Sequence, residues 1–531
     1  MAMGLLPSAH VDTFCRDHLP PADQWPDLLF TLPELTYPDR LNCATALLDD
    51  VIARHGADRP CLISQDGATW TYADLLARAD AVAHVLVDDL GLVPGNRVLL
   101  RGPNNPWLAA CWFGVLKAGG VVVATMPLLR SGELATIHEI ASLDAALVDH
   151  RFLDAAAGLG VPTIAYGGEA PDDLTQRVRS KPTTFDDVAT SCDDVALLAF
   201  TSGTTGRPKA TMHLHRDVLA VCDTFSRYVL RPTHNDVFTG TPPFAFTFGL
   251  GAVLLFPLHA GASTLLVEKA TPAKLATLIT EHGVTICSTA PTAYKAMLGA
   301  GASLPTLRQA VSAGEHLAAA TWQAFLEATG IAIIDGIGST EMLHIFIGSS
   351  GDEIRPGSTG RAVPGYVACV LDEAGNEVPD GERGRLAVRG PTGCRYLADE
   401  RQRSYVQQGW NITGDTFTRD ADGYFWYQAR SDDMIISSGY NIAAPEVEEA
   451  LLGHPSVNEC AVVGVADEAR GMRVKAYVVL ADGSESPSAQ ELQEFVKASI
   501  APYKYPREIE FVAELPRTAT GKLQRFRLRD A

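Results

Sequence analysis

One segment of the sequence gathers hydroxyl groups, glycines and a lysine into nine residues. It reads TSGTTGRPK over residues 201–209 and follows DVALLAF, an apolar run typical of a buried strand. Glycines allow backbone N–H groups to converge on one point, the hydroxyls add donors, and Lys209 adds positive charge. Convergent donors of this kind bind phosphate oxygens, although an ordinary loop has a similar composition. The segment is not a Walker P-loop, because the GxxxxGK[ST] pattern is absent. The candidate phosphate-binding residues are Thr201, Ser202, Gly203, Thr204, Thr205, Gly206 and Lys209.

Two further small-residue segments follow strand-like runs. The first reads DGIGSTE over residues 335–341 and comes directly after IAII. Its glycines allow a planar ligand to approach closely, and the carboxylate of Glu341 suits Mg²⁺ beside phosphates. The second reads SAGE over residues 312–315. Each segment is also compatible with a tight strand–helix turn, and the first lacks the third glycine of the dinucleotide fingerprint.

Two polar groups nearer the C-terminus complete the set. The run TGD at 413–415 places Asp415 on an expected turn, where its carboxylate could hold two ribose hydroxyls; a surface Asx turn is the alternative. Lys522 lies in PRTATGK, an expected flexible loop from which its ammonium could reach charge developing on a phosphate. The stretch from Arg517 to Arg529 carries five cations and no acid, which indicates either an anionic partner or a solvated tail.

Strands and helices that could position these groups alternate through the first four hundred residues. We expect strands at 97–102 and 120–126 with the helix-like run PWLAACWFGVLKAG between them. The same alternation returns at CLISQ, AALVD, ALLAF, STLLVE and IAIIDGIG. Strands separated by helices predict layered α/β structure with largely parallel sheets. The run 237–267 has no charged residue, but its prolines and the absence of a flanking cationic cluster favour a buried core over a membrane span.

The composition changes near residue 430. Before it, LAVRG and GYFWYQAR predict a small β unit; after the polar segment ARSDDMI at 429–435, a helix, two strands and an amphipathic helix predict a compact α+β unit. The predicted fold class is therefore α/β. It has a large N-terminal body of several subdomains, with layered α/β sheets plus the small β unit, and a smaller mobile α+β C-terminal domain. We place the two domains at residues 1–431 and 432–531.

The overall composition excludes several classes of protein. The chain has 531 residues, a formal net charge of −20 and 47% hydrophobic residues. The acidic balance argues against nucleic-acid binding, and the apolar content excludes disorder as the main state. Ten scattered cysteines form no C-x-x-C pair, which favours reduced thiols and no metal-ligand cluster. The N-terminus lacks the features of an export signal. We predict a cytoplasmic protein, monomer or homodimer, with neither nucleic-acid nor membrane partners.

Taken in order, these motifs resemble the superfamily of adenylate-forming enzymes, which includes acyl- and aryl-CoA synthetases, luciferases and carrier-protein adenylation domains. TSGTTGRPK matches the phosphate-loop signature, STE at 339–341 the Thr-Glu motif, and TGD the ribose-binding Asp. RSDD at 430–433 looks like the hinge, although Ala429 replaces the usual glycine, and PRTATGKLQR looks like the catalytic-lysine loop. Within the superfamily, DGIGSTEMLHIF, Asp432-Asp433-Met434 and YKYPR resemble the benzoate/2-aminobenzoate–CoA ligase branch. The N-terminal run AHVDTFCRDHLPP resembles the 2-aminobenzoate members.

The resemblance implies an ATP-dependent ligase with two half-reactions. An aryl carboxylate attacks the α-phosphate of ATP to give an acyl-adenylate and pyrophosphate, and the CoA thiol then displaces AMP. The implied roles are β/γ-phosphate binding for the 201–209 loop, α-phosphate contact for Thr340, Mg²⁺ for Glu341, ribose for Asp415, and bridging of the carboxylate and α-phosphate for Lys522. The C-terminal domain is expected to rotate about Asp432 between the two steps. Further nucleotide-binding residues are Ala313, Gly314, Glu315, Asp335, Gly336, Ile337, Gly338, Ser339 and Arg430, and the CoA-binding residues are Ser437, Ser438, Gly439 and Tyr440.

Recognition of the acid is expected in PPFAFTFG at 242–249. Phe246 looks like the family's gating aromatic, and flat apolar walls from Phe246, Phe248 and Ile337 suit a benzene ring. Phe225 is a further candidate wall. His344 comes three residues after Glu341, on the same face if the segment is helical, and is either a core histidine or a pocket wall near an ortho substituent.

Several readings stay open at this level. The small-molecule acid could be benzoate, 2-aminobenzoate, a hydroxybenzoate, a cinnamate or a fatty acid, and the acceptor could be a carrier-protein thiol instead of CoA. A non-catalytic nucleotide-binding protein is a third possibility, which the intact Lys522, Glu341 and Asp415 argue against.

Overall fold

A computed structural model describes residues 5–201, 207–430, 434–437, 440–467, 471–481, 483, 486–500, 502–517 and 523–529. Its first sheet has six strands in the order β6-β5-β3-β4-β7-β8. These are β6 (Thr163–Tyr166), β5 (Ala145–Asp149), β3 (Arg97–Arg101), β4 (Val121–Thr125), β7 (Val195–Thr201) and β8 (Lys209–Leu214). Strands β6 through β7 run parallel, and β8 returns antiparallel to β7. The predicted parallel α/β layer is confirmed, and β8 closes it as an edge hairpin.

The second sheet has eight strands in the order β14-β13-β12-β11-β9-β10-β1-β2. These are β14 (Ile345–Gly348), β13 (Ile334–Gly338), β12 (Gln309–Ala313), β11 (Ile286–Thr289), β9 (Val237–Gly240), β10 (Ser263–Leu266), β1 (Pro60–Ser64) and β2 (Thr69–Thr71). Only the outermost pairs, β13–β14 and β1–β2, are antiparallel. Helices α11 (Pro272–Glu281), α12 (Pro291–Gly299) and α13 (Ala319–Thr329) connect its parallel strands.

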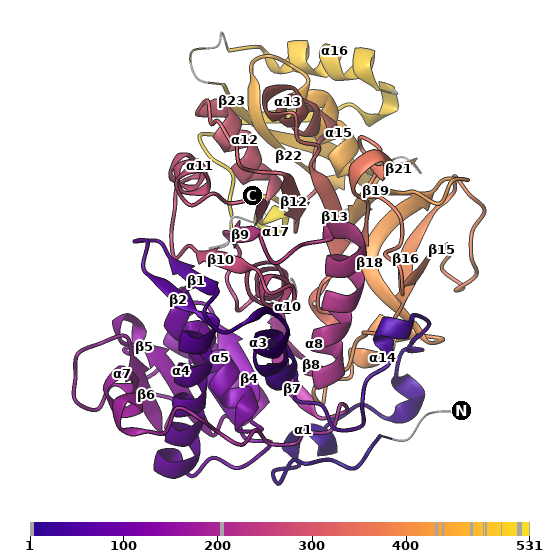
Figure 1. Cartoon of the computed structure of the whole chain (residues 1–531). Coiled ribbons are helices and arrows are strands. Elements are labelled where there is room, and N and C mark those ends of the chain that lie inside the picture. Colours follow the sequence, from indigo (N-terminus) through magenta and orange to yellow (C-terminus); the bar gives the residue numbers. More distant parts are fainter. Residues whose placement is uncertain are drawn as a thin grey trace.

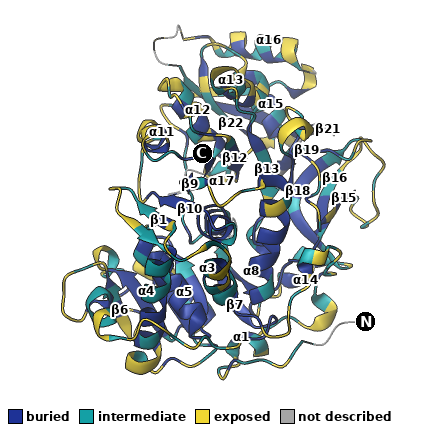
Figure 2. Cartoon of the chain, in the orientation of Figure 1, coloured by how far each residue is buried: buried dark blue, intermediate teal, exposed yellow. Residues whose placement is uncertain are grey.

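Two helices join the first two sheets into one body. Helix α4 (Tyr72–His84) begins in a capping box of Thr71 and Asp74, and α5 (Pro106–Lys117) begins with Pro106 behind an Asn105 side-chain cap. Almost every residue of α5 is buried, including Trp112. A continuous apolar core therefore runs between the sheets through these helices. In Figure 2, α5 and α8 (His215–Val221) are buried, whereas α11 and α16 (Ala489–Ser499) show exposed faces.

The remaining strands form two smaller sheets. Antiparallel β15 (Val367–Leu371), β16 (Arg383–Arg389), β17 (Val406–Gln407), β18 (Trp410–Arg419) and β19 (Phe425–Arg430) form the predicted small β unit. The C-terminal sheet contains β20 (Met434–Ser437), β21 (Tyr440–Ala443), β22 (Val457–Asp467), β23 (Gly471–Leu480) and β24 (Glu508–Phe511), with α15 (Ala444–Leu452), α16 and α17 (Arg525–Arg529). It packs around its own apolar cluster, separate from the core of the body. Figure 1 shows β22, β23, α15 and α16 of this unit near the top of the molecule. A large α/β body with a smaller C-terminal α+β unit is thus confirmed.

The uncharged run 237–267 forms β9, α9 (Thr247–Leu250), a π-helix (Gly251–Leu255), α10 (Phe256–His259) and β10, as expected of a buried core segment. Within the described residues, no helix combines the length and apolar content that crossing a membrane requires. All ten cysteines are free, and nine are buried.

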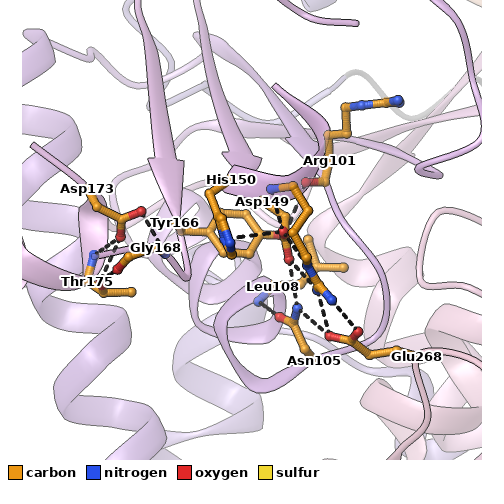
Figure 3. Close-up of polar contacts among 11 residues, drawn as sticks. Arg101, Asn105, Leu108, Asp149, His150, Tyr166, Gly168, Asp173, Thr175 and Glu268 are labelled. Carbon is orange, nitrogen blue, oxygen red and sulfur yellow. Dashed lines mark hydrogen bonds and ion pairs between the residues drawn. The ribbon is translucent and has the colours of Figure 1, made fainter. Parts of the chain in front are cut away.

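A cluster of polar side chains, formed by Asn105, Asp149, Arg151 and Glu268, joins the two large sheets beside a cavity of about 340 Å³. The guanidinium of Arg151 donates to Asp149 at the end of β5 and to Glu268 after β10, in both cases at 2.8 Å. Asn105 donates to the same two carboxylates, and Figure 3 shows Asn105, Asp149 and Glu268 converging. The charged groups of Arg151, Asp149 and Glu268 are paired with one another. This cluster is therefore explained by its structural role, which is to link the two sheets.

A buried cluster around Lys117 also stabilises the body. Its fully buried ammonium lies 2.9 Å from Asp49, 3.2 Å from Asp80 and 2.8 Å from Asp187. Three carboxylates share one ammonium, so the cluster would carry a net negative charge if all three were ionised. Burial makes such a charge unfavourable. Burial raises the pKa of Asp80 to about 6 from its usual 3.8.

This raised pKa predicts a pH dependence of stability. Between about pH 4 and pH 6 the folded chain keeps a proton on Asp80 that the unfolded chain has lost, so the unfolding free energy falls as pH rises through this interval. Asp80→Asn removes that loss. Urea titrations should therefore show the stability of the variant, relative to wild type, increasing from pH 4 to pH 7. The exposed Asp58→Asn is the matched control, and a pH-independent difference for Asp80→Asn would contradict the prediction.

Candidate active site

The proposed phosphate loop joins β7 to β8 at the edge of the first sheet. Thr201 ends β7 and Lys209 begins β8, and the two are paired across the antiparallel ladder. The two flanks of the loop are therefore held side by side. Ser202, Gly203, Thr204, Thr205 and Gly206 lie outside the described residues. The phosphate nest itself stays a prediction.

Lys209 and Glu341 are brought together by a tyrosine that the sequence did not single out. The ammonium of Lys209 donates to the Tyr396 hydroxyl at 2.6 Å, and that hydroxyl donates to Oε1 of Glu341 at 2.5 Å. Nζ of Lys209 lies 3.7 Å from the same carboxylate oxygen. Burial, together with the Glu341 charge, raises the pKa of Tyr396, so the phenol stays neutral. The half-buried cation, the buried phenol and the buried carboxylate thus form one chain of contacts.

The Thr-Glu motif lies on a single turn of 3₁₀ helix, Thr340–Met342. Ser339 caps this turn, and His213 donates from Nε2 to the carbonyl oxygen of Thr340 at 2.8 Å. Burial lowers the pKa of His213 to about 4, so the ring is neutral and carries its proton on Nε2 for this bond. Leu343 follows with φ of +68°, a strained conformation for a side chain with a Cβ that costs on the order of 1–3 kcal/mol.

This turn corrects the expectation for His344. The helix ends at Met342, Leu343 reverses the chain, and β14 begins at Ile345. Glu341 and His344 therefore do not share a helical face. The three-residue spacing predicts a shared face only in an α-helix. Between β13 and β14 the chain instead forms a single 3₁₀ turn, Thr340–Met342.

Strand pairing brings two of the nucleotide motifs together. Asp335 and Gly336 of β13 pair with Ser312 and Ala313 of β12. Residues 335–338 belong to β13, as the strand-like run IAIIDGIG predicts, and the turn follows at Thr340–Met342; Gly314, at φ of +89°, lies directly after β12. Oδ1 of Asp335 is buried without a hydrogen-bond partner among the described residues, and burial raises the pKa of this carboxyl to about 8. It is thus available to an incoming polar group.

The TGD motif also lies in a strand. Thr413, Gly414 and Asp415 are part of β18, and Gly414 has φ of +78° at an irregularity in the ladder. The expectation of a turn is corrected to a distorted strand, because β16 and β19 pair on both sides of this segment. Asp415 is buried and pairs through its backbone with Arg430, whose side chain lies outside the described part.

Arg517 ties the C-terminal unit to the nucleotide motifs. Its guanidinium lies 3.8 Å from Glu315 and 2.8 Å from Glu459, and its backbone bridges to Leu523. Residues 518–522, which include Lys522, lie between these two anchored positions and outside the described residues. Arg525 pairs with Glu448 at 2.8 Å. Among the described C-terminal cations, Arg517 and Arg525 thus pair with glutamates of the protein itself.

A second group of residues surrounds His344 with aromatic rings. Ring centroids of Phe225, Phe248 and Phe256 lie 5.3, 5.7 and 4.5 Å from the imidazole. The ring is buried, and no hydrogen bond of normal geometry reaches either nitrogen from the described residues. Burial, partly offset by the nearby backbone of Phe248, lowers its pKa to about 3. A Cβ on Gly251 would lie 2.3 Å from the imidazole, so only glycine fits there. Sequence reasoning missed Phe256 and Gly251, which lie in a uniformly apolar run that offers no signal.

The other acid and CoA candidates lie on separate elements. Phe246 precedes α9 and is half-buried, and Ile337 of β13 is half-buried against the core. Ser437 is buried at the end of β20. Ser438, Gly439 and the hinge candidate Asp432 lie outside the described residues, as does the side chain of Tyr440. Within the described part, no group of three or more histidine, cysteine or acidic side chains is arranged to bind a metal.

The family model for AMP-binding enzymes matches residues 48–396, and the model for the AMP-binding enzyme C-terminal domain matches residues 446–522. A benzoate–CoA ligase from Thauera aromatica is 35% identical, with 94% of this chain and 98% of that protein covered. A 3-hydroxybenzoate–CoA ligase from Aromatoleum sp. (strain CIB) is 32% identical, with 92% and 97% covered. The crystal structure of an anthranilate CoA ligase in complex with anthranoyl-AMP matches with a TM-score of 0.89 and 34% identity, covering 94% and 98% of the two chains.

Proposed function

The chain belongs to the family of AMP-binding enzymes and is an ATP-dependent aryl-CoA ligase that works through an acyl-adenylate, and we propose that it prefers 2-aminobenzoate, with benzoate next. The observation that carries the preference is the imidazole of His344, which is buried among phenylalanines and receives no hydrogen bond of normal geometry from the described residues. Apolar walls of this kind suit a benzene ring, and an ortho amine would supply a hydrogen-bond partner to an imidazole nitrogen.

The first half-reaction joins the acid to AMP. A carboxylate oxygen attacks the α-phosphorus while the bond to pyrophosphate breaks, so charge builds up on phosphate oxygens and no side chain has to act as nucleophile. We assign the β/γ-phosphates to the 201–209 loop, the α-phosphate to Thr340 and the ribose to Asp415. Lys522 would bridge the carboxylate and the α-phosphate. The unpaired oxygen of Asp335 is suited to the exocyclic amine of adenine.

Glu341 fits Mg²⁺, which the family uses with ATP. A carboxylate is the hard oxygen donor that this ion prefers, and Oε1 is the oxygen that Tyr396 and Lys209 engage. Bound there, Mg²⁺ would neutralise negative charge on the phosphates. Thr340, on the same turn, would present its hydroxyl beside it.

The second half-reaction transfers the acyl group to the thiol of CoA and releases AMP. We propose that the C-terminal domain, residues 432–531, rotates about Asp432 against the body, residues 1–431, and that Ser437–Tyr440 then line the thiol path. The separate apolar cluster of the C-terminal unit supports this division. Its polar contacts with the body include Arg517 with Glu315, Arg383 with Glu446, the Ala319 N–H with Glu449, and Lys295 with the carbonyl of Asn458. We further propose a cytoplasmic monomer or homodimer.

The proposed substrate is tested by a CoA-dependent AMP-release assay over benzoate, 2-aminobenzoate, 3- and 4-hydroxybenzoate, a cinnamate and a medium-chain fatty acid. We expect the highest kcat/KM for 2-aminobenzoate. A lead for the fatty acid or the cinnamate would overturn the acid assignment, and AMP release without CoA consumption would favour a carrier-protein acceptor.

His344→Leu should change the choice among acids more than the overall rate. Without the imidazole, a buried amine loses its partner at a cost of about 1–3 kcal/mol, so kcat/KM for 2-aminobenzoate should fall about tenfold or more. Benzoate has no ortho group that could bond to the imidazole, so its kcat/KM should stay within about threefold of wild type. This value also shows whether the variant is correctly folded. Equal losses for both acids would mean that His344 is only a wall.

A further inference from the structure

We propose that the hydroxyl of Tyr396 is a positioning group that keeps Lys209 and Glu341 from closing on each other, so that both stay available to the nucleotide and its metal. This inference rests on the proposed function, because it concerns the residues assigned to the phosphates and to Mg²⁺. It adds a role for a residue outside every motif of the sequence.

The geometry of the three side chains carries the proposal. The Tyr396 oxygen accepts from Lys209 at 2.6 Å and donates to Oε1 of Glu341 at 2.5 Å, whereas the ammonium itself stays 3.7 Å from that oxygen. A direct charge-assisted bond between ammonium and carboxylate is about 2.7–2.9 Å. The phenol therefore occupies the place where the direct ion pair would form. The ring adds a second contact, since Nζ of Lys209 lies 4.4 Å from its centroid.

Tyr396 is held so that it cannot move away. The residue is fully buried, its N–H donates to Gln402 at 2.9 Å, and its backbone bridges to Thr211 on the same strand as Lys209. The preceding residue, Arg395, makes a buried ion pair with Asp217 at 2.7 Å. Breaking such a pair is costly, so the backbone at Tyr396 is well determined.

The consequence follows from electrostatics at a poorly hydrated site, where Glu341 and Tyr396 are buried and Lys209 is half-buried. Without the hydroxyl, Lys209 and Glu341 are close enough to form a direct ion pair, which is strong where water is scarce. Each charge would then neutralise the other, and phosphate or metal binding would have to break the pair first. With the hydroxyl present, both charges hydrogen-bond to the neutral phenol of Tyr396. A phosphate or a metal ion can replace these hydrogen bonds more easily than it can break a direct ion pair.

Tyr396→Phe tests the proposal, because it removes one oxygen and keeps the ring. By calorimetry, the Kd of a non-hydrolysable ATP analogue in the presence of Mg²⁺ should rise about tenfold, and the Mg²⁺ concentration for half-maximal binding about fivefold. Acyl-adenylate formation should slow about tenfold. Thioester formation from supplied acyl-adenylate should stay within about twofold, since pyrophosphate and its metal have already left. In a Glu341→Gln background the same substitution should have little further effect on Kd.

Tyr72→Phe is the matched control, because it removes a buried phenol hydroxyl that donates to the carbonyl of Ala262 at 2.7 Å, far along the sequence from every proposed site residue. An unchanged Kd and Mg²⁺ dependence for Tyr396→Phe would overturn the inference. Equal slowing of both half-reactions with a lowered melting temperature would also overturn it, by assigning Tyr396 a merely structural role. If the wild-type enzyme forms no aryl-CoA at all, it is the proposed function that fails, whereas the binding measurement still decides the role of Tyr396.

Discussion

Glu341→Gln should slow acyl-adenylate formation by about two to three orders of magnitude and leave the fold intact. Glutamine keeps the shape of the side chain and can still accept the hydrogen bond from Tyr396, but it removes the charge proposed to bind Mg²⁺. Preorganised charge next to a reacting phosphate supplies a large part of such a rate, and the loss of one group of this kind costs about 10²–10³-fold.

Pyrophosphate–ATP exchange with 2-aminobenzoate, followed over a range of Mg²⁺ concentrations, measures the effect. The exposed Glu353→Gln serves as the control, and thermal unfolding of both variants should match wild type. Exchange within fivefold of wild type at saturating Mg²⁺ would remove Glu341 from the metal site.

Lys522→Ala should abolish the first half-reaction to a similar extent while sparing the second. Arg517 and Leu523 anchor the two ends of the segment that contains Lys522, and Arg517 lies 3.8 Å from Glu315 of the SAGE turn. In this arrangement the segment begins beside the motif assigned to the nucleotide. An ammonium that joins the attacking carboxylate to the α-phosphate offsets the repulsion between two anions, which a neutral side chain cannot do.

The measurement is a pair of assays: acyl-adenylate formation from ATP and acid, and aryl-CoA formation from supplied acyl-adenylate. Only the first should fall, by about 10²–10³-fold. Lys274→Ala, at an exposed position on α11, is the control. Parental adenylate formation by Lys522→Ala would refute the assignment, and equal losses in both assays would argue against a domain rotation that removes the lysine.

Local features of the chain were well predicted from sequence. The apolar runs became the strands β3, β4, β5 and β7, and Asn105 and Pro106 began α5 as their residue types favour. The order of the glycine- and hydroxyl-rich motifs identified the family, because each motif is a contiguous stretch whose chemistry depends on few neighbours. The change near residue 430 likewise marked a unit that has its own apolar cluster.

Errors of local structure arose where a partner strand overrides local preference. TGD has the composition of a turn, yet pairing with β16 and β19 holds it in a strand. The position expected for His344 assumed a helix that continues past Glu341, but the helix ends before Leu343. The φ of +68° at Leu343 is strained, so the surrounding structure must stabilise it.

What the sequence by itself determined was the set of chemical groups, their order along the chain and the elements that carry them. The tertiary structure alone decided which groups meet. Lys209 reaches Tyr396 because β8 bridges to the backbone of that residue, and His344 lies in an apolar environment because Phe225, Phe248 and Phe256, from separate segments, surround it. Such contacts depend on strand order and on close packing between distant segments, and no local pattern encodes either of them.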